Sequence, residues 1–270
     1  MRYDHSHFAT MIAALAITLC LHGGARGQTH IGDIWLTLAN SQVVTGRINP
    51  DQTITLSRVF QSTLGDSGFD GFTANPGYDA AHVFNSAYRI GFNILSPLQR
   101  WNGNGLEPTG DETMTLSFLT ATRTTGACYV PGFDLAVQSD GGWHRHLSMF
   151  LNPPSGGTAL PGIYIVKLQL YYTAPGAVNS KPYWLVFNHL DSTTNHDAAY
   201  AWVIAHLVQP TCPADVNGSG AVDVSDLLTI ITSWGIGGGA AWCNSADVND
   251  DGVVNVGDLL AVITAWGNCP

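Results

Sequence analysis

Oxygen-bearing side chains near the C-terminus recur with a spacing that suits a hard cation. In a twelve-residue loop that starts at Asp215, such side chains occupy positions 1, 3, 5, 9 and 12, and position 6 is glycine. The first loop offers Asp215, Asn217, Ser219, Asp223 and Asp226 around Gly220. The second loop, 32 residues later, offers Asp247, Asn249, Asp251, Asn255 and Asp258 around Gly252. Ca²⁺ takes about six to eight oxygens, and the backbone carbonyl at position 7 adds Ala221 or Val253. The spacing therefore predicts two calcium sites.

The two loops differ at position 5, which is Ser219 in the first loop and Asp251 in the second. A hydroxyl oxygen carries no negative charge, and calcium affinity rises with the charge of the ligands. We therefore expect the first site to bind calcium more weakly than the second.

Each loop is followed by apolar residues with helical spacing. Residues i, i+3, i+4 and i+7 are Leu227, Ile230, Ile231 and Trp234 in the first copy and Leu259, Val262, Ile263 and Trp266 in the second. This period predicts an amphipathic helix after each loop. Pro210 and Pro213 stand where an incoming helix would lie, and proline disfavours a helix there. The unit is therefore a loop and one helix, duplicated.

This duplicated half-hand resembles the type I dockerin module of secreted bacterial proteins, over about residues 212–270. The resemblance implies docking on a cohesin through loop positions 10 and 11 and through basic residues later in the helix. Here positions 10 and 11 are Val224 and Ser225, then Val256 and Gly257, and no Lys or Arg follows Lys181. The resemblance thus implies a cohesin-like or cell-surface protein partner, while the residues at the family's contact positions depart from its usual pattern.

Residues 1–27 have the pattern of a secretory signal peptide. An apolar stretch from Met11 to Leu21 follows Arg2, and small residues precede a cleavage point before Gln28. The stretch is too short for a bilayer, which needs about 20 apolar residues. We expect a secreted or cell-surface protein without a membrane span.

Cleavage there would remove Cys20 and leave four cysteines, which could form two disulfides in an oxidising compartment. A two-fold arrangement of half-hands brings the ends of the module together, so Cys212 with Cys269 is the preferred pair. Cys128 with Cys243 would then tie the module to the rest of the chain.

The formal net charge is −10, and seven acids but no Lys or Arg follow Cys212. Bound calcium would neutralise part of this excess. No basic patch is present in the sequence, so nucleic acid and anionic membrane surfaces are not expected partners.

Residues 28–208 form a separate body, and residues 209–270 form the module. Apolar residues of the body alternate with period two in short segments, which are separated by Gly, Pro, Asn and Asp. The segments are 34–38, 53–57, 89–94, 113–118, 144–151, 162–172 and 183–188. No regular helical crossovers intervene, so the pattern predicts a mainly β body, an antiparallel β-sandwich or jelly roll. Residues 195–207 fit a helix capped by Asn195 and, nearly as well, a strand.

Two histidines of the body, His144 and His146, would share one face of a strand and could bind a metal ion together. His30, His189 or His196 could complete such a site. A half-buried pair with ordinary hydrogen bonds is the alternative.

Exposed aromatic rings could bind glycans, and Trp101 and Trp143 are the candidates because each lies beside Gly or Asn. Aromatic residues on strands also serve as core or cross-strand partners. A glycosidase would need two carboxylates, and Glu107, Asp111 and Glu112 lie together in one loop that also reads as a solvated turn.

Neither a G-x-S-x-G motif nor a phosphate-binding glycine loop occurs in the chain. The leading hypothesis is a secreted, non-catalytic protein, in which a calcium module attaches a binding or structural β-sandwich to an extracellular partner. The alternatives are a component of polysaccharide breakdown, either a glycoside hydrolase or a carbohydrate-binding protein, and an extracellular metal-binding protein that uses His144 and His146.

Overall fold

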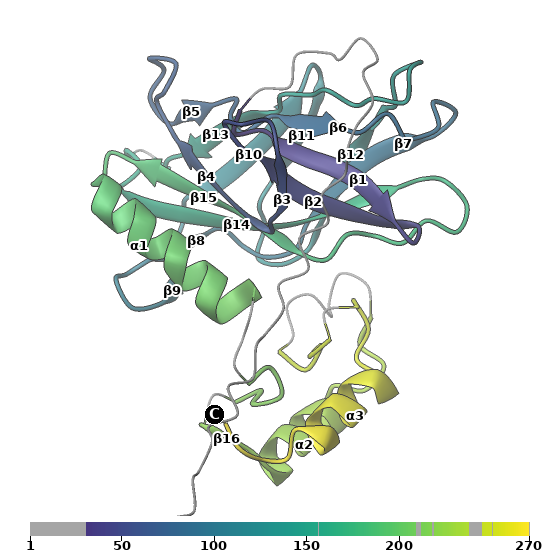
Figure 1. Cartoon of the computed structure of the whole chain (residues 1–270). Helices are drawn as coiled ribbons and strands as arrows, with labels where there is room; N and C mark the ends of the chain where they lie inside the picture. Colours follow the sequence, from purple (N-terminus) through teal and green to yellow (C-terminus); the bar gives the residue numbers. More distant parts are fainter. Residues whose placement is uncertain are drawn as a thin grey trace, which may run out of the picture.

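The computed structural model describes residues 31–155, 157–208, 212–217, 219–237, 245–249 and 251–269. Three sheets and one long helix make up the body, and two short helices make up a C-terminal module (Figure 1). The predicted mainly β fold with a small helical module is confirmed. The predicted signal peptide lies outside the described residues.

A seven-stranded sheet is the centre of the body. Its main path has the order β12-β7-β14-β15-β4, and β8 and β9 join beside β14. The strands are β4 (Val59–Thr63), β7 (Arg89–Ile94), β8 (Gln99–Trp101), β9 (Leu106–Pro108), β12 (Val130–Ala136), β14 (Gly162–Tyr172) and β15 (Tyr183–His189). Every residue of β15 is buried, as are nine of the eleven residues of β14. A strand with both faces covered has this pattern.

Two four-stranded sheets cover one face of this central sheet. The first has the order β3-β2-β1-β6, with β1 (Ile34–Ala39), β2 (Gln42–Ile48), β3 (Ile54–Leu56) and β6 (Tyr78–Ala80). The second has the order β11-β10-β13-β5, with β5 (Phe72–Thr73), β10 (Thr113–Phe118), β11 (Ala121–Thr124) and β13 (Ser148–Asn152). The main hydrophobic core lies between the sheets. Alternate residues of β14 point into it: Tyr164, Val166, Leu168 and Leu170.

The opposite face of the central sheet is covered by a helix. Ile163 and Ile165 of β14 pack there against Ala199 and Val203 of α1 (Thr193–Val203), which continues into the π-helical turn η1 (Ile204–Val208). Figure 1 shows α1 lying along β14 and β15. The helical alternative for residues 195–207 is therefore the observed one. The N-cap of α1 is Ser192, whose hydroxyl accepts a hydrogen bond from the Asn195 N–H. The prediction that Asn195 caps this helix was therefore wrong.

Two further details differ from the expectation. Not every strand pair is antiparallel, because β1 pairs with β6 and β15 pairs with β4 in parallel. In addition, the expected strand over 144–151 begins only at Ser148. Residues 144–147 lie outside the regular strands, and Arg145 forms an isolated antiparallel bridge with Tyr78.

The C-terminal module is built from α2 (Val224–Thr232), α3 (Val256–Thr264) and the short strands β16 (Ala221–Val222) and β17 (Gly267–Asn268). Its core is distinct from that of the body and repeats with the 32-residue offset of the sequence: Ala214 with Ala246, Val222 with Val254, and Ile230 with Val262. The duplicated sequence therefore folds as two equivalent halves that share one core.

Candidate calcium and partner-binding sites

The first loop is folded around its carboxylates. Asp215, at position 1, accepts hydrogen bonds from the Ser219 and Gly220 N–H groups at 2.9 and 2.7 Å. Gly220 has a φ of +89°, a conformation that glycine adopts without strain, and this turn folds the loop back toward Asp215. Asn217 Oδ1 also accepts from the Ser219 N–H at 2.9 Å. These contacts bring the oxygens of positions 1, 3 and 5 to the same region of the loop.

The second loop has the same arrangement. Asp247 accepts from the Asp251 and Gly252 N–H groups at 3.1 and 2.9 Å, and Gly252 has a φ of +88°. Asn249 Oδ1 accepts from the Asp251 N–H at 2.9 Å. The side-chain amides of Asn249 and Asn255 both point at Asp251 Oδ2, at 3.0 and 3.4 Å. Position 5, where the two loops differ in sequence, therefore carries a carboxylate at the centre of the second loop.

The aspartate at position 12 closes each loop onto the helix that follows. Asp226 accepts from the Val216 and Asn217 N–H groups with one oxygen, at 2.8 and 3.1 Å, and from the Asp223 N–H with the other, at 2.9 Å. Burial acts to raise the pKa of Asp226, but these backbone donors outweigh it and lower the pKa. Asp258 makes the equivalent contacts with Val248, Asn249 and Asn255. Both aspartates are fully buried and belong to capping boxes at the starts of α2 and α3.

The donor set of each loop fits calcium. Every predicted side-chain ligand offers oxygen, the carboxylates and amides converge within one loop, and no imidazole or thiolate is among them. The chain would supply Asp215, Asn217, Ser219, the Ala221 carbonyl, Asp223 and Asp226 in the first loop. It would supply Asp247, Asn249, Asp251, the Val253 carbonyl, Asn255 and Asp258 in the second. These ligand sets remain predictions from the spacing, and the folded loops are compatible with them.

The two halves are joined at both ends. Ala221 and Val222, beside the first loop, pair with Asn268 and Gly267 after the second helix. Val253, in the second loop, forms the equivalent bridge with Gly237. The Cys212–Cys269 disulfide, which the sequence favoured, closes the module across a separation of 57 residues. Cys128 is also disulfide-bonded, and Cys243, its predicted partner, lies outside the described residues.

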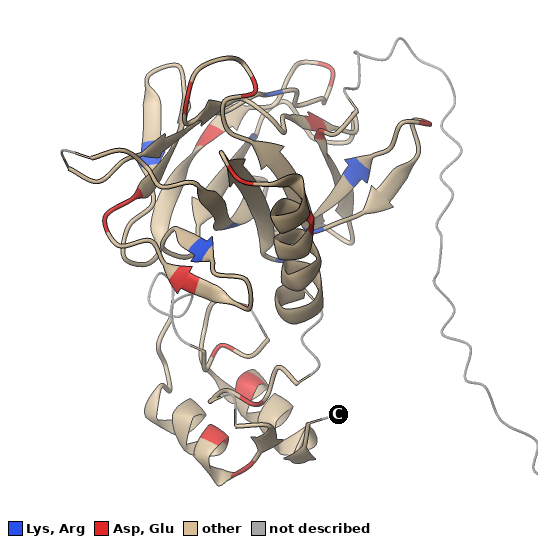
Figure 2. Cartoon of the chain, turned by 90° about the vertical axis from the view of Figure 1, so that its left-hand side faces the viewer, with Lys and Arg blue, Asp and Glu red and all other residues tan. Residues whose placement is uncertain are grey.

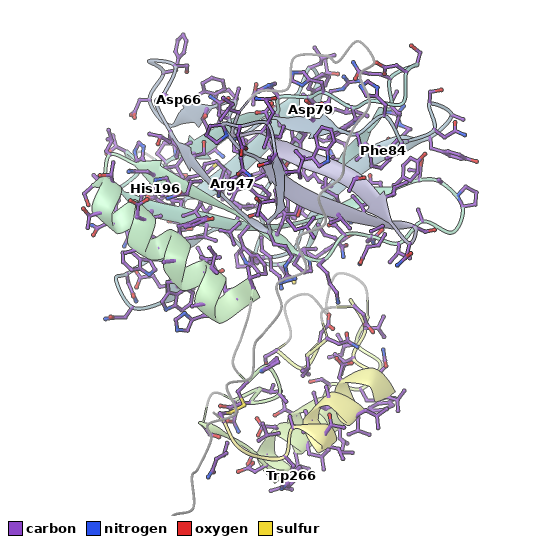
Figure 3. All side chains as sticks on the ribbon, in the orientation of Figure 1. Arg47, Asp66, Asp79, Phe84, His196 and Trp266 are labelled. Atoms are coloured by element: carbon purple, nitrogen blue, oxygen red, sulfur yellow. A yellow bond between two sulfur atoms is a disulfide. The ribbon has the colours of Figure 1, made fainter. Side chains whose placement is uncertain are left out.

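Each helix of the module leaves a stripe of large apolar side chains exposed. Val224, Leu228 and Ile231 follow one another at i, i+4 and i+7 on α2, and each is 50–56% exposed. The stripe of α3 consists of Val256, Leu260 and Ile263, which are equally exposed, and Trp234 and Trp266 follow the two helices with 50% and 53% exposure. Figure 3 shows Trp266 on the outer side of the module. Of the apolar residues that predicted the two amphipathic helices, Ile230 and Val262 are buried in the module core, whereas Ile231, Trp234, Ile263 and Trp266 are exposed.

The charges of the module are of one sign. In the described part of the module, Figure 2 colours only Asp and Glu positions, because the sequence has no Lys or Arg after Lys181. The module therefore combines an acidic calcium-loop side with two exposed apolar stripes, which is an arrangement suited to a protein partner.

In the body, His144 and His146 lie with their ring centroids 5.2 Å apart. Asp33, which precedes β1, joins them, and one ligand atom from each of the three residues lies within 4.8 Å of the others. The structure does not add His189 or His196 to this group: His189 is buried 3.8 Å from Asp70, and His196 bonds the Val186 carbonyl at 2.9 Å. His30 lies outside the described residues. The sequence offered no local signal for Asp33, which is more than 100 positions away.

The two tryptophans proposed for glycan binding have different surroundings. Trp143 is only 2% exposed, packs edge-on against Tyr78 and donates its indole N–H to the Leu135 carbonyl. Its ring is therefore not accessible to a sugar, and the prediction for Trp143 was wrong. The neighbouring glycine suggested an exposed loop, but Trp143 is part of the hydrophobic core. Trp101, on β8, is partly buried against the α1 side of the central sheet. Glycan binding at Trp101 remains a prediction.

The acids of the loop 107–112 have structural partners. Glu107 pairs with Arg100 at 3.3 Å, and Glu112 is buried and accepts from the Leu160 N–H and the Tyr164 hydroxyl at 3.0 and 3.1 Å. Burial and the Glu112 charge raise the Tyr164 pKa far above its ordinary value. These partners give Glu112 a role in holding β14, and Asp111 is exposed.

A cleft of about 480 Å³ lies between β2, β3 and the end of α1. Arg47, on its wall, donates to the Val59 carbonyl and the Tyr200 hydroxyl at 3.3 and 2.9 Å (Figure 3 labels Arg47). The Arg58 guanidinium donates to the Val208 carbonyl and lies over the Trp184 ring. The hydrogen bonds of these two arginines thus connect α1 and η1 to the sheets.

Residues 213–265 match the family model of the dockerin type I domain. The match coincides with the duplicated loops and helices, and it confirms the resemblance of the module. It does not extend to the body. No curated protein matches the chain.

Among solved structures, the chain is similar to a family 123 glycoside hydrolase from Clostridium perfringens, with 11% identity and a TM-score of 0.25. This alignment covers 53% of the chain and only 24% of that enzyme. The CooA pilin subunit from enterotoxigenic Escherichia coli is similar with 10% identity and a TM-score of 0.27, over 53% of the chain and 95% of the pilin. Likenesses of this strength define neither the fold of the body nor its function.

None of the helices in the described part of the chain is both long enough and apolar enough to cross a membrane.

Proposed function

We propose that this protein is a secreted, non-catalytic attachment protein. Its C-terminal module binds two calcium ions and docks on a cohesin-type partner, and it thereby holds the β-sandwich body at an extracellular surface. The observation that carries the proposal is the pair of equivalent apolar stripes on α2 and α3, next to two calcium-type loops. Dockerin domains bind cohesins, which is why a partner of that kind is the one proposed.

The stripes support docking because they leave large apolar side chains in water. Transfer of a leucine-sized side chain from water into an interface is worth about 1.5–3 kcal/mol. The stripes start at loop position 10, Val224 and Val256, so the order of each calcium loop determines how its stripe is presented. Calcium would therefore control docking by ordering the loop and the first turn of the helix.

The domain limits are proposed as 28–208 for the body and 209–270 for the module. They are supported by the hydrophobic cores, because the two body cores contain no residue after Val208 and the module core contains none before Cys212 within the described ranges. Lys181 of the body donates to the Asn249 carbonyl of the second loop at 3.2 Å. Secretion is supported by the Cys212–Cys269 disulfide, which persists in oxidising compartments.

The test is the binding of the full mature chain to a panel of purified type I cohesin domains, with calcium saturating and with a chelator. We expect binding that requires calcium. The double variant Leu228→Asp, Leu260→Asp changes both stripes and should weaken that binding by at least about tenfold, because two apolar contacts are lost.

The matched control is Leu119→Asp, which changes a leucine of the body that is 90% exposed. It should leave cohesin binding unchanged. Equal binding by the double variant and the wild type would show that the stripes are not the docking surface. Absence of calcium-dependent binding to the whole panel would refute a cohesin-type partner.

A further inference from the structure

Three segments of the body that are distant in sequence lie side by side near one edge of the β1–β6 sheet. Ile34 pairs in parallel with Tyr78, and Tyr78 forms an antiparallel bridge with Arg145, with N···O distances of 2.7 and 3.0 Å. In this register Asp33 is level with Gly77, and Gly77 is level with His146. The next positions on the same face, by the period of two, are Asp79 and His144.

Gly77 lies between Asp33 and His146 in this register, and its lack of a side chain allows the side chains of these two residues to approach each other. Its N–H donates to Asp33 Oδ1 at 2.9 Å, and a Cβ at Gly77 would overlap the imidazole of His146. His146 Nε2 therefore reaches Asp33 Oδ2, at 3.6 Å. The missing side chain of Gly77 thus leaves room for the Asp33 carboxylate and the His146 imidazole, which come from different segments, to lie close together.

The hydrogen bond on the other nitrogen determines what His146 presents to Asp33. Nδ1 lies 2.9 Å from the Ala74 carbonyl, and a carbonyl oxygen only accepts, so Nδ1 carries a hydrogen. In a neutral imidazole the lone pair is then on Nε2, facing the carboxylate. Histidines that bind metals commonly donate their other N–H to a backbone carbonyl in this way.

The spacing of the three groups suits a small divalent ion. Zinc bonds of about 2.0–2.2 Å at a tetrahedral angle place two ligand atoms about 3.4 Å apart. The Nε2 to Oδ2 distance is 3.6 Å, and the ligand atoms of Asp33, His144 and His146 all lie within 4.8 Å of one another. His144 is half-buried, and its ligand atom belongs to the same group.

We propose that Asp33, His144 and His146 form a binding site for a divalent transition-metal ion of the zinc type. Two imidazole nitrogens and one carboxylate oxygen are ligands that zinc prefers, and three protein ligands leave a position for water or an external ligand. The site is independent of the calcium loops, whose donors are all oxygens.

The charges around the three residues favour a cation. The Asp33 side chain is only 4% exposed, and a buried carboxylate needs a compensating charge. The Arg145 guanidinium, which lies between the two histidines in the sequence, donates to the His144 and Ala136 carbonyls. Asp79, which Figure 3 labels and which is level with His144 in the register, places a second carboxyl group near the three residues.

Zinc titration of the full mature chain, monitored by calorimetry and by metal analysis after dialysis, tests the proposal. Calcium is kept saturating so that the loops of the module are filled. We expect one zinc ion per chain. His146→Asn and Asp33→Asn should each weaken zinc binding by about 10–100-fold or more. His206→Asn, which changes an exposed histidine near the end of α1, is the matched control and should bind zinc like the wild type.

Cobalt(II) spectroscopy of the unaltered chain gives a second readout that does not depend on a variant that folds. Visible absorption of tetrahedral cobalt that zinc displaces would support the site. The proposal fails if no zinc binds while calcium is saturating. It also fails if folded His146→Asn and Asp33→Asn variants keep the affinity of the wild type.

Discussion

At the scale of single residues, the aspartate at position 12 combines two roles in each half of the module. Asp258 is fully buried, accepts three backbone N–H groups and is also a predicted calcium ligand. Asp258→Ala should therefore lower the calcium affinity of the second site by at least about 10–100-fold, and it should also destabilise the start of α3. Calcium titration calorimetry resolves the two sites.

The matched control is Asp197→Ala, which removes an exposed aspartate of α1 that accepts a hydrogen bond from the Gln61 side chain and should leave both sites unchanged. The comparison of the two loops adds a gain-of-affinity test. Ser219→Asp supplies the carboxylate that the first loop lacks, so the affinity of the first site should rise toward that of the second. If neither Asp258→Ala nor Ser219→Asp changes the calcium affinity, the predicted calcium ligands are wrong.

At the scale of elements, a pair of buried tyrosines joins two sheets of the body. The hydroxyl of Tyr78, on β6, lies 2.7 Å from that of Tyr183, on β15. Burial raises the pKa of Tyr78 to about 12 and that of Tyr183 well above its ordinary value. Both pKa values are raised on folding, so the folded body keeps protons that the unfolded chain releases. The contribution of this pair to the free energy of unfolding should be fully present below about pH 10, and it should decrease as the pH rises through about 12.

Tyr183→Phe leaves the Tyr78 hydroxyl buried without this partner and should lower the free energy of unfolding by about 1–3 kcal/mol at neutral pH. Urea denaturation measures this loss, and Tyr88→Phe is the control. Within the described residues no hydrogen bond involves the Tyr88 hydroxyl, and its ring is only partly buried. The Tyr78→Phe, Tyr183→Phe double variant should lose much of the alkaline dependence. If the stability of the double variant depends on alkaline pH as strongly as that of the wild type, other titratable groups cause this dependence.

At the scale of the whole molecule, body and module have separate hydrophobic cores and separate sources of stability. Removal of calcium should loosen the module, because several carboxylates are then held together without a cation. The Cys212–Cys269 disulfide opposes this, since closing a loop of this length is worth about 4 kcal/mol in chain entropy. Chelation should therefore unfold the module fully only in the Cys212→Ser, Cys269→Ser variant.

Calorimetry combined with limited proteolysis checks this prediction in wild type and variant, with and without calcium. The thermal transition of the body should stay at the same temperature in all four conditions, since its cores contain none of the module residues that the structure describes. A body transition that shifts together with that of the module would show that the two fold as one cooperative unit.

The sequence by itself determined the duplicated calcium-type loops, their order and the helices that follow. Each of these depends on residues within one duplicated unit, so spacing along the chain translates directly into spacing in space. The sequence favoured the Cys212–Cys269 pair but did not fix it, because the two cysteines lie at opposite ends of the module. The β class of the body also followed from period two, because alternation of side chains is a local property of a strand.

Only the tertiary structure decided which distant residues meet. The approach of Asp33 to His146 depends on the register of three segments and on the missing side chain of Gly77. The burial of Trp143 and the exposure of Ile231 and Ile263 depend on how much apolar surface each core can accommodate. Neither register nor core volume is encoded in a local pattern, because both arise from the whole set of packed elements.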